Sequence, residues 1–160
     1  MRQRPFALAL PFAALLLAAA VRFGPPRLEI REVRDTPPVP GAVLLVEGHH
    51  HTDEPEADVS ARAITMRGGT RESRPITLTR YGATGHYAVT KQWAAGTPWL
   101  LVFTIKQGKH EAYNTAEVFV KVNASGGVDA IEPLMERNAR GDRYPRAATE
   151  AEIAEALRGR

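Results

Sequence analysis

The chain contains no cysteine and few methionines, and each shortage excludes a class of site or of stabilisation. Without cysteine, no disulfide holds the fold and no thiol acts as a nucleophile or as a metal ligand. Three methionines are too few to indicate a carrier that holds Cu(I) through sulfur. A packed apolar core must therefore stabilise the protein unaided, and a chain of 160 residues is long enough to bury one.

A large excess of charge of one sign is also missing. The formal net charge is +3, and it becomes +1 when Arg2 and Arg4 are left out. A chain so close to neutral has no general attraction for a phosphate backbone, so we expect no nucleic acid among its partners.

The short motifs of common catalytic sites are absent as well. The sequence has no G-x-S-x-G elbow, no H-E-x-x-H helix and no phosphate-binding glycine loop. We therefore expect that the protein is not an enzyme. The alternative is a catalytic site that only the fold assembles from distant residues.

The one long apolar run covers residues 6–20 and follows two basic residues, Arg2 and Arg4. A basic start, an apolar middle and the small residues 18–20 are the layout of a secretory signal peptide. A membrane-spanning helix needs about 20 apolar residues, so a cleaved leader is favoured over a retained anchor. We expect residues 1–20 to be removed and the protein to be exported, either periplasmic or secreted. Contact with a membrane is expected only if the leader is kept.

Short alternating runs separated by glycine-rich turns predict β-strands in most of the remaining chain. The predicted strands cover residues 28–33, 42–47, 59–66, 75–81, 86–93, 99–105 and 116–122. The run 99–105 is apolar on both faces, which predicts a central strand. About seven short strands with such turns predict an all-β fold, an antiparallel immunoglobulin-like or transthyretin-like sandwich. We divide the chain into a leader (1–20), an extended linker with a first strand (21–40), the sandwich (41–127) and a charged tail (128–160).

Within the tail, residues 131–145 are charged and are expected to be irregular. Thr149 and Glu152 then form a capping box, which predicts a short C-terminal helix. Ile153 and Leu157 lie four residues apart, so this helix has a narrow apolar stripe that docks on the sandwich or on a partner.

A short motif in the second half of the chain indicates a family of folds. It comprises residues 85–89 (GHYAV), Trp93 and residues 96–102 (GTPWLLV). The motif resembles the exported immunoglobulin-like modules called YtkA-like or FixH-like, and also the carboxypeptidase-regulatory and transthyretin-like modules. The resemblance covers roughly residues 43–122 and implies glycine corners with aromatic plugs between two sheets. It implies a fold and not a chemistry.

The segment His49-His50-His51 is the clearest candidate for a ligand site. His49 and His51 would share one face of an extended strand, and Asp53 follows closely. Imidazoles and carboxylates bind Zn²⁺ or Cu²⁺, so these three residues are the candidate metal ligands. The alternative is a polar strand end that enters an acidic, solvent-exposed loop. His86 and His110 could complete a site only if the fold brings them close.

These observations leave three functional hypotheses. The leading one is a non-catalytic exported β-sandwich module that binds an envelope or extracellular protein, or that supports an envelope assembly. The second is binding or delivery of divalent copper or zinc through the segment 49–51. The third is an enzyme whose site is assembled by the fold.

Overall fold

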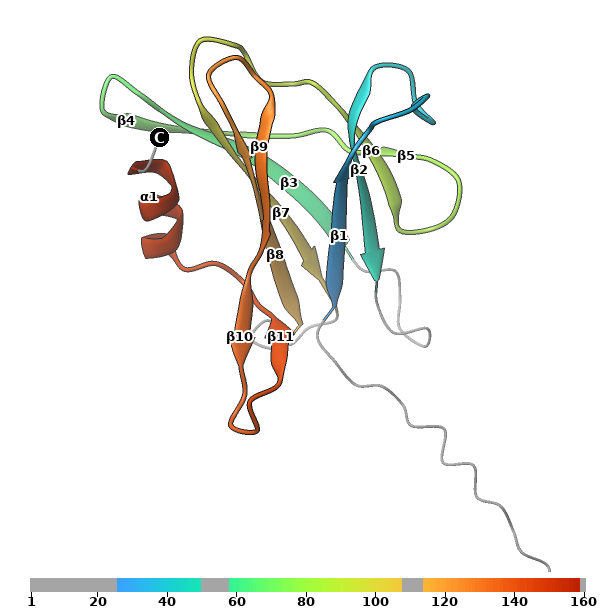
Figure 1. Ribbon diagram of the computed structural model, residues 1–160, viewed down its shortest axis with the longest axis vertical. Helices are drawn as coiled ribbons and strands as arrows, with labels where there is room; N and C mark the ends of the chain where they lie inside the picture. Colours follow the sequence, from blue (N-terminus) through green and yellow to red (C-terminus); the bar gives the residue numbers. More distant parts are fainter. Residues whose placement is uncertain (1–25, 50–57, 108–113, 159–160) are drawn as a thin grey trace, which may run out of the picture.

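The structure is a computed structural model that describes residues 26–49, 58–107 and 114–158. In these residues the chain forms two antiparallel β-sheets that pack face to face, a short hairpin and one helix (Figure 1). The strand order of the smaller sheet is β1 (Arg27–Glu32), β2 (Ala42–His49), β6 (His86–Thr90) and β5 (Thr79–Arg80). The strand order of the larger sheet is β4 (Thr70–Pro75), β3 (Asp58–Arg67), β7 (Trp99–Lys106), β8 (Thr115–Val122) and β9 (Val128–Pro133). A hairpin of β10 (Met135–Arg137) and β11 (Arg143–Pro145) precedes the helix α1 (Glu150–Arg158).

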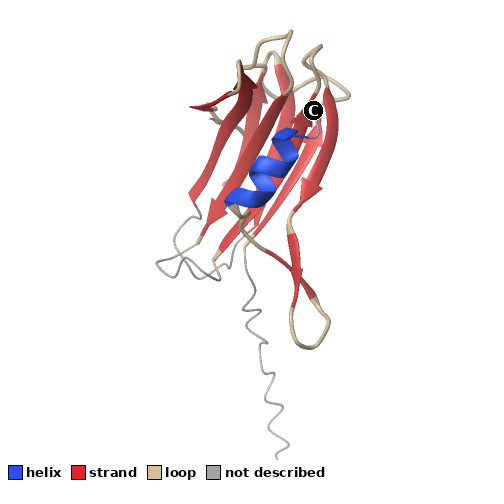
Figure 2. Cartoon of the chain, turned by 90° about the vertical axis from the view of Figure 1, so that its left-hand side faces the viewer, coloured by secondary structure: helices blue, strands red, loops and turns tan. Residues whose placement is uncertain are grey.

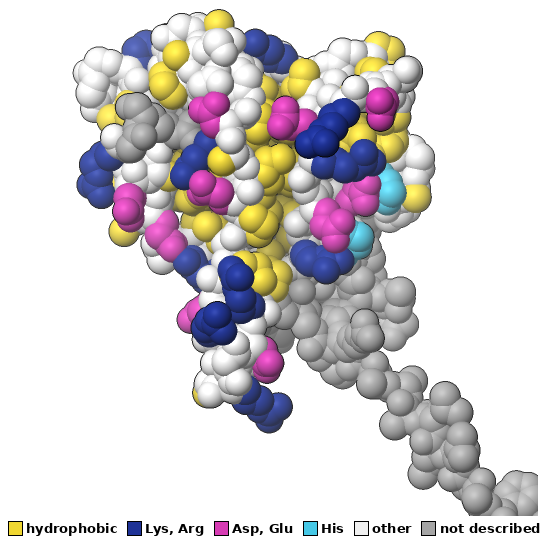
Figure 3. Space-filling model, in the orientation of Figure 1, with side chains coloured by type: hydrophobic (Ala, Val, Ile, Leu, Met, Phe, Trp, Pro, Cys, Tyr) yellow, Lys and Arg dark blue, Asp and Glu magenta, His cyan; other side chains and the backbone are white. Residues whose placement is uncertain are grey.

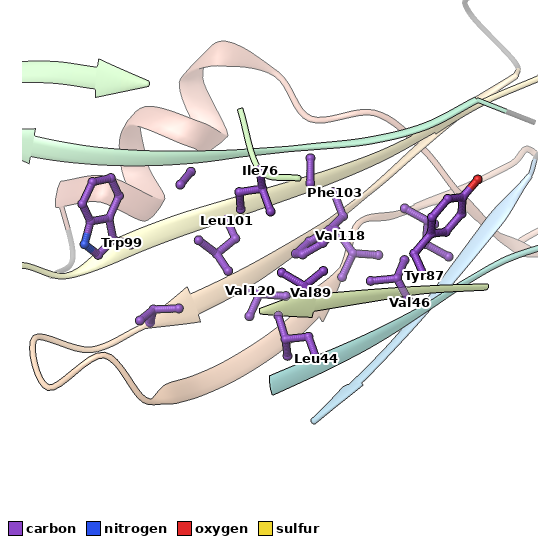
Figure 4. Close-up of a cluster of buried hydrophobic side chains, with 14 of the residues drawn as sticks. Leu44, Val46, Ile76, Tyr87, Val89, Trp99, Leu101, Phe103, Val118 and Val120 are labelled. Carbon is purple, nitrogen blue, oxygen red and sulfur yellow. The ribbon is translucent and has the colours of Figure 1, made fainter. Parts of the chain in front are cut away.

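The predicted antiparallel β-sandwich with a short C-terminal helix is therefore confirmed. The two sheets contain four and five strands, where the sequence predicts about seven in all. The core between them consists of the alternate side chains that the strand pattern selects, and Figure 4 shows a part of it. Its buried members include Leu44, Val46, Tyr87, Val89, Trp99, Leu101, Phe103, Val118 and Val120.

The strand β7 is the middle strand of the five-stranded sheet, as its two apolar faces predict. One face carries Leu101 and Phe103 into the core between the sheets. The other face carries Leu100 and Val102, which pack under α1 together with Phe119 of β8. A strand that is covered on both sides must be apolar on both sides, which explains the continuous apolar run.

The helix α1 lies across the outer face of the five-stranded sheet, which Figure 2 shows from the helix side. Ile153 and Leu157 are its buried residues, so the predicted stripe docks on the sandwich. The capping box is also confirmed, because the Glu152 N–H donates to the Thr149 hydroxyl at 3.2 Å and the Thr149 N–H donates to the Glu152 carboxylate at 2.8 Å. These two bonds satisfy donors that would otherwise lack partners at the start of the helix.

Both tryptophans plug the core, as the resemblance implies. Trp93 is 4% exposed and Trp99 is 2% exposed. The indole N–H of Trp93 donates to the Gly126 carbonyl at 3.0 Å, and that of Trp99 donates to the Ala94 carbonyl at 2.9 Å. Since each buried indole N–H has an acceptor, a hydrogen bond offsets the cost of removing it from water.

The predicted strand at residues 75–81 is wrong. The chain instead leaves the larger sheet at the end of β4, crosses to the smaller sheet at residues 76–78 and forms only the two-residue strand β5. The Gln92 side chain takes the place of a neighbouring strand at the crossing, because its amide donates to the Thr77 carbonyl and accepts from the Thr77 N–H, both at 2.9 Å. Ile76 points into the core during the crossing. Its apolar character produced the alternation that suggested a longer strand.

Two further expectations need correction. The strand β6 ends at Thr90 and does not continue to Trp93. Residues 131–145 are not irregular, because β9 extends to Pro133 and the hairpin β10-β11 follows. These strands have few buried side chains, so their pairing with β8 and with each other leaves little trace in the hydrophobic pattern.

Candidate functional site

An apolar groove lies on one side of the sandwich, between the edge strand β1 of one sheet and the edge strand β9 of the other. We call it the seam groove. Its volume is about 550 Å³, which lies in the range of ligand-binding clefts. In Figure 3 it lies in the strip of hydrophobic side chains between the charged groups of the two sheets. Its apolar lining comprises Leu28, Ile30, Ala116, Val118, Ile131, Pro133, Leu134, Met135 and Pro145.

The groove exists because the two sheets do not join on this side. In the part of the chain that the structure describes, β1 pairs only with β2 and β9 pairs only with β8. Leu28 is buried and forms part of the floor, whereas Ile30 and Ile131 are only half-buried on either side. Two strand edges and an apolar floor therefore lie next to one another.

The outer face of β1 carries charges of alternating sign at Arg27, Glu29 and Arg31. Arg27 forms an ion pair with Glu29 at 2.8 Å, and Arg31 approaches Glu47 of β2 at 3.5 Å. Both arginine side chains are more than half exposed. Such exposed pairs contribute little to stability, so these side chains are free to exchange partners.

A second feature lies on the same outer face, across three strands. Glu29 of β1 is directly opposite Glu47 of β2, and Glu47 is directly opposite His86 of β6. His49 follows Glu47 by two residues on the same face, and its Nε2 is 3.7 Å from Glu29 Oε1. We call Glu29, Glu47, His49 and His86 the outer-face cluster. Figure 3 shows histidine side chains beside acidic and basic groups on this sheet.

The structure brings only part of the predicted metal site into view. His49 is exposed at the end of β2 and has a carboxylate neighbour. His51 and Asp53 lie outside the described residues, as does His110. His86, which could join a site only if the fold brought it close, lies on the strand next to β2 opposite Glu47, and its ring meets the Tyr81 ring edge-on with centroids 5.8 Å apart.

The two glutamates of the outer-face cluster were missed at the level of sequence. Each belongs to a strand that can be predicted, and each has the parity of an outward-facing residue. Their juxtaposition depends on the register of β1 against β2, which no local pattern reveals. Once that register is known, the two glutamates stand out, because like charges at directly opposed outward positions destabilise an antiparallel pair.

Among the described carboxyl groups, that of Glu152 in the first turn of α1 has the most strongly shifted pKa. Arg146, together with the Thr149 N–H and hydroxyl, lowers the pKa of Glu152 to about 2. The Glu117 carboxylate of β8 lies nearby and is buried, where it accepts from the Thr104 hydroxyl at 2.7 Å and from the Ala148 N–H at 2.8 Å. Glu152 of α1 binds Arg146 and Thr149 in the segment that precedes the helix, and Glu117 binds the same segment from β8 at Ala148. The hydrogen bonds from Arg146 and Thr149 account for the lowered pKa of Glu152, so the shift alone does not mark a functional site.

Comparison of the chain with models of known protein families, with curated proteins and with solved structures finds no significant match to any of them. What the structure defines is the class, a mostly-β protein of two packed antiparallel sheets. Among the described residues, no helix is long and apolar enough to cross a membrane.

Proposed function

We propose that this protein is a non-catalytic, exported β-sandwich module that binds another protein by accepting an extended segment of that protein in the seam groove. The observation that carries the proposal is the groove itself, where an apolar floor lies between two strand edges. The resemblance of residues 85–102 to exported immunoglobulin-like modules and the leader pattern of residues 1–20 support export. An envelope or extracellular protein is the partner that this location implies.

The chemistry of the groove fits recognition by strand addition. In that mode the main chain of an extended guest pairs with a free strand edge, and alternate guest side chains enter apolar pockets. The strand β1 is the better edge for such pairing, because its six residues include no proline. The edge of β9 is interrupted by Pro133, which has no N–H to donate.

The charges of β1 define the guest more closely. A guest strand beside β1 places its outward side chains next to Arg27, Glu29 and Arg31. Directly opposed residues of opposite charge stabilise an antiparallel pair, and like charges destabilise it. The expected guest is therefore an extended segment with apolar residues at every second position and an acidic, basic, acidic sequence at the positions between them.

A photo-crosslinking experiment tests the proposal. A photoreactive amino acid is placed at Ile30 in the groove or, as a matched control, at Met66, which is 42% exposed on β3 away from the seam. We expect Ile30 to capture a defined partner in the host and Met66 not to capture it. With the partner purified, Ile30→Asp should weaken binding about tenfold or more, and Met66→Asp should leave it unchanged.

Hydrogen exchange supplies the second readout, because strand addition should protect amides of β1 when the purified partner binds. Equal capture at both positions, no capture at Ile30, or binding that survives Ile30→Asp would each refute the proposed groove. Export is tested separately by mass spectrometry of the protein from its host. A mature chain that begins at Val21 is expected, and an intact Met1 would contradict cleavage of the leader.

A further inference from the structure

We propose that the outer-face cluster binds a divalent transition-metal ion of the Zn²⁺ class, with Glu29, Glu47 and His49 as ligands and His86 as the fourth donor. This inference rests on a different chemistry from the seam groove and shares only Glu29 with it, because Glu47, His49 and His86 do not line the groove. It also differs from the ligand set that the sequence alone suggests, which has His49 but not Glu29 or Glu47 and names His86 only as a residue that could complete the site.

The ligand atoms already lie close together. One oxygen of Glu29, one oxygen of Glu47 and one imidazole nitrogen of His49 are all within 4.8 Å of one another. Ligands on one tetrahedral Zn²⁺ are about 3.3 Å apart, which follows from bond lengths of about 2.0 Å. The three side chains are at least partly exposed, so small rotations close this gap without moving the backbone.

The backbone places the ligands on rigid elements. Gly48 lies between the ligands Glu47 and His49 and faces the core, where a Cβ would meet Val59 Cγ2 at 3.1 Å and Ile105 Cδ1 at 3.2 Å. Its N–H donates to the Gly85 carbonyl at 2.9 Å. Gly48 thus seats the end of β2 tightly against the opposite sheet and against the start of β6, which begins with His86. Ligands held by packed strands need little ordering when an ion binds.

The donor set selects the kind of ion. Two carboxylate oxygens with one or two imidazoles suit Zn²⁺ and related divalent ions. Ca²⁺ and Mg²⁺ prefer sites made of oxygen alone, and Cu(I) prefers sulfur, which this cluster does not contain. We therefore expect Zn²⁺ to bind and Ca²⁺ and Mg²⁺ to bind weakly or not at all.

An ion also resolves an electrostatic conflict in the sheet. Glu29 and Glu47 are like charges at directly opposed positions, an arrangement that destabilises an antiparallel pair. Arg27 and Arg31 offset this repulsion, but their side chains are 60% and 64% exposed. Exposed ion pairs of this kind are weak, so both arginines can turn to solvent when a divalent cation takes their place.

Calorimetric titration of the tag-free protein with ZnCl₂ tests the site. We expect one equivalent of Zn²⁺ to bind with a Kd of about 10 µM or tighter. Glu29→Gln, Glu47→Gln and His49→Ala should each weaken binding about tenfold or more. The control is Glu32→Gln, an exposed glutamate on the same strand that is not part of the cluster, and it should leave the affinity unchanged.

A second measurement distinguishes this ligand set from the one suggested by sequence. Nuclear magnetic resonance should show that Zn²⁺ shifts the imidazole signals of His49 and His86, and circular dichroism should show that every variant is folded. The proposal fails if no Zn²⁺ binds below about 100 µM. It also fails if Glu32→Gln weakens binding as much as Glu29→Gln, or if binding requires His51 and Asp53 but survives the loss of Glu29 and Glu47.

Discussion

Replacing Ile153 by alanine tests how the C-terminal helix is held. Ile153 is 1% exposed and packs in a cluster with Leu100, Val102 and Phe119. The substitution removes three carbon atoms, which correspond to about 2.4 kcal/mol of transfer free energy at about 0.8 kcal/mol per carbon. A cavity adds to this cost, but α1 has only nine residues and can shift to fill part of the space. We expect the free energy of unfolding to fall by about 3 kcal/mol.

Urea unfolding followed by the fluorescence of Trp93 and Trp99 measures the change. With a denaturant slope of about 2 kcal/mol/M, the midpoint should fall by roughly 1.5 M. Glu155→Ala on the exposed face of the same helix is the control, and it should change stability by less than about 0.5 kcal/mol. A loss of less than about 0.5 kcal/mol for Ile153→Ala would refute the docking of the helix on the sheet.

Two further predictions concern a turn and a charge. Gly85 has a φ of +80°, and a Cβ there would lie 2.8 Å from the Gly48 carbonyl oxygen, whereas Gly82 has a φ of +60° and open space around it. Gly85→Ala should therefore cost about 3 kcal/mol and Gly82→Ala about 1 kcal/mol in thermal unfolding, and equal costs would contradict the close approach. The pKa of Glu152 is lowered to about 2 in the folded protein, so its contribution to stability is complete above its ordinary pKa of 4.5 and is lost as the pH falls towards 2. Because its side chain is 33% exposed, solvent screening reduces this contribution to about 1 kcal/mol. Glu152→Gln should lower stability by that amount at pH 7, and a difference that does not shrink towards pH 2 would show that the charge is not the cause.

The sequence was sufficient to predict the strands that bury one face or both. The strands β7 and β8 have apolar side chains at every second position because those positions meet the core. Because burial requires apolar residues at these positions, the sequence shows the two-residue period directly. The predicted ends of β7 and β8 therefore lie within one residue of the observed ends. The capping residues Thr149 and Glu152 located the helix for a similar reason, since a local hydrogen-bond requirement selects residue types at fixed spacing.

Strands whose side chains are not buried could not be predicted from the sequence. All six residues of β4 are exposed, so nothing in their side chains records a strand. Its pairing with β3 follows from the turn Gly68-Gly69, where both residues have positive φ, and from the backbone ladder that this turn starts. The outer-face cluster could not be predicted for a different reason. Glu29 and Glu47 are 18 positions apart in the sequence and lie side by side only because of the register between β1 and β2.

The crossing at residues 76–78 connects the two sheets along one side of the sandwich. There the chain passes from one sheet to the other. The Gln92 side-chain amide donates to the Thr77 carbonyl and accepts from the Thr77 N–H, so hydrogen bonds hold the crossing in place. Within residues 26–49, 58–107 and 114–158, no backbone ladder joins β1 to β9, which are the edge strands on the opposite side of the sandwich. Under the proposed function, a guest in the seam groove would leave this crossing intact, because Ile76, Thr77 and Gln92 do not line the groove.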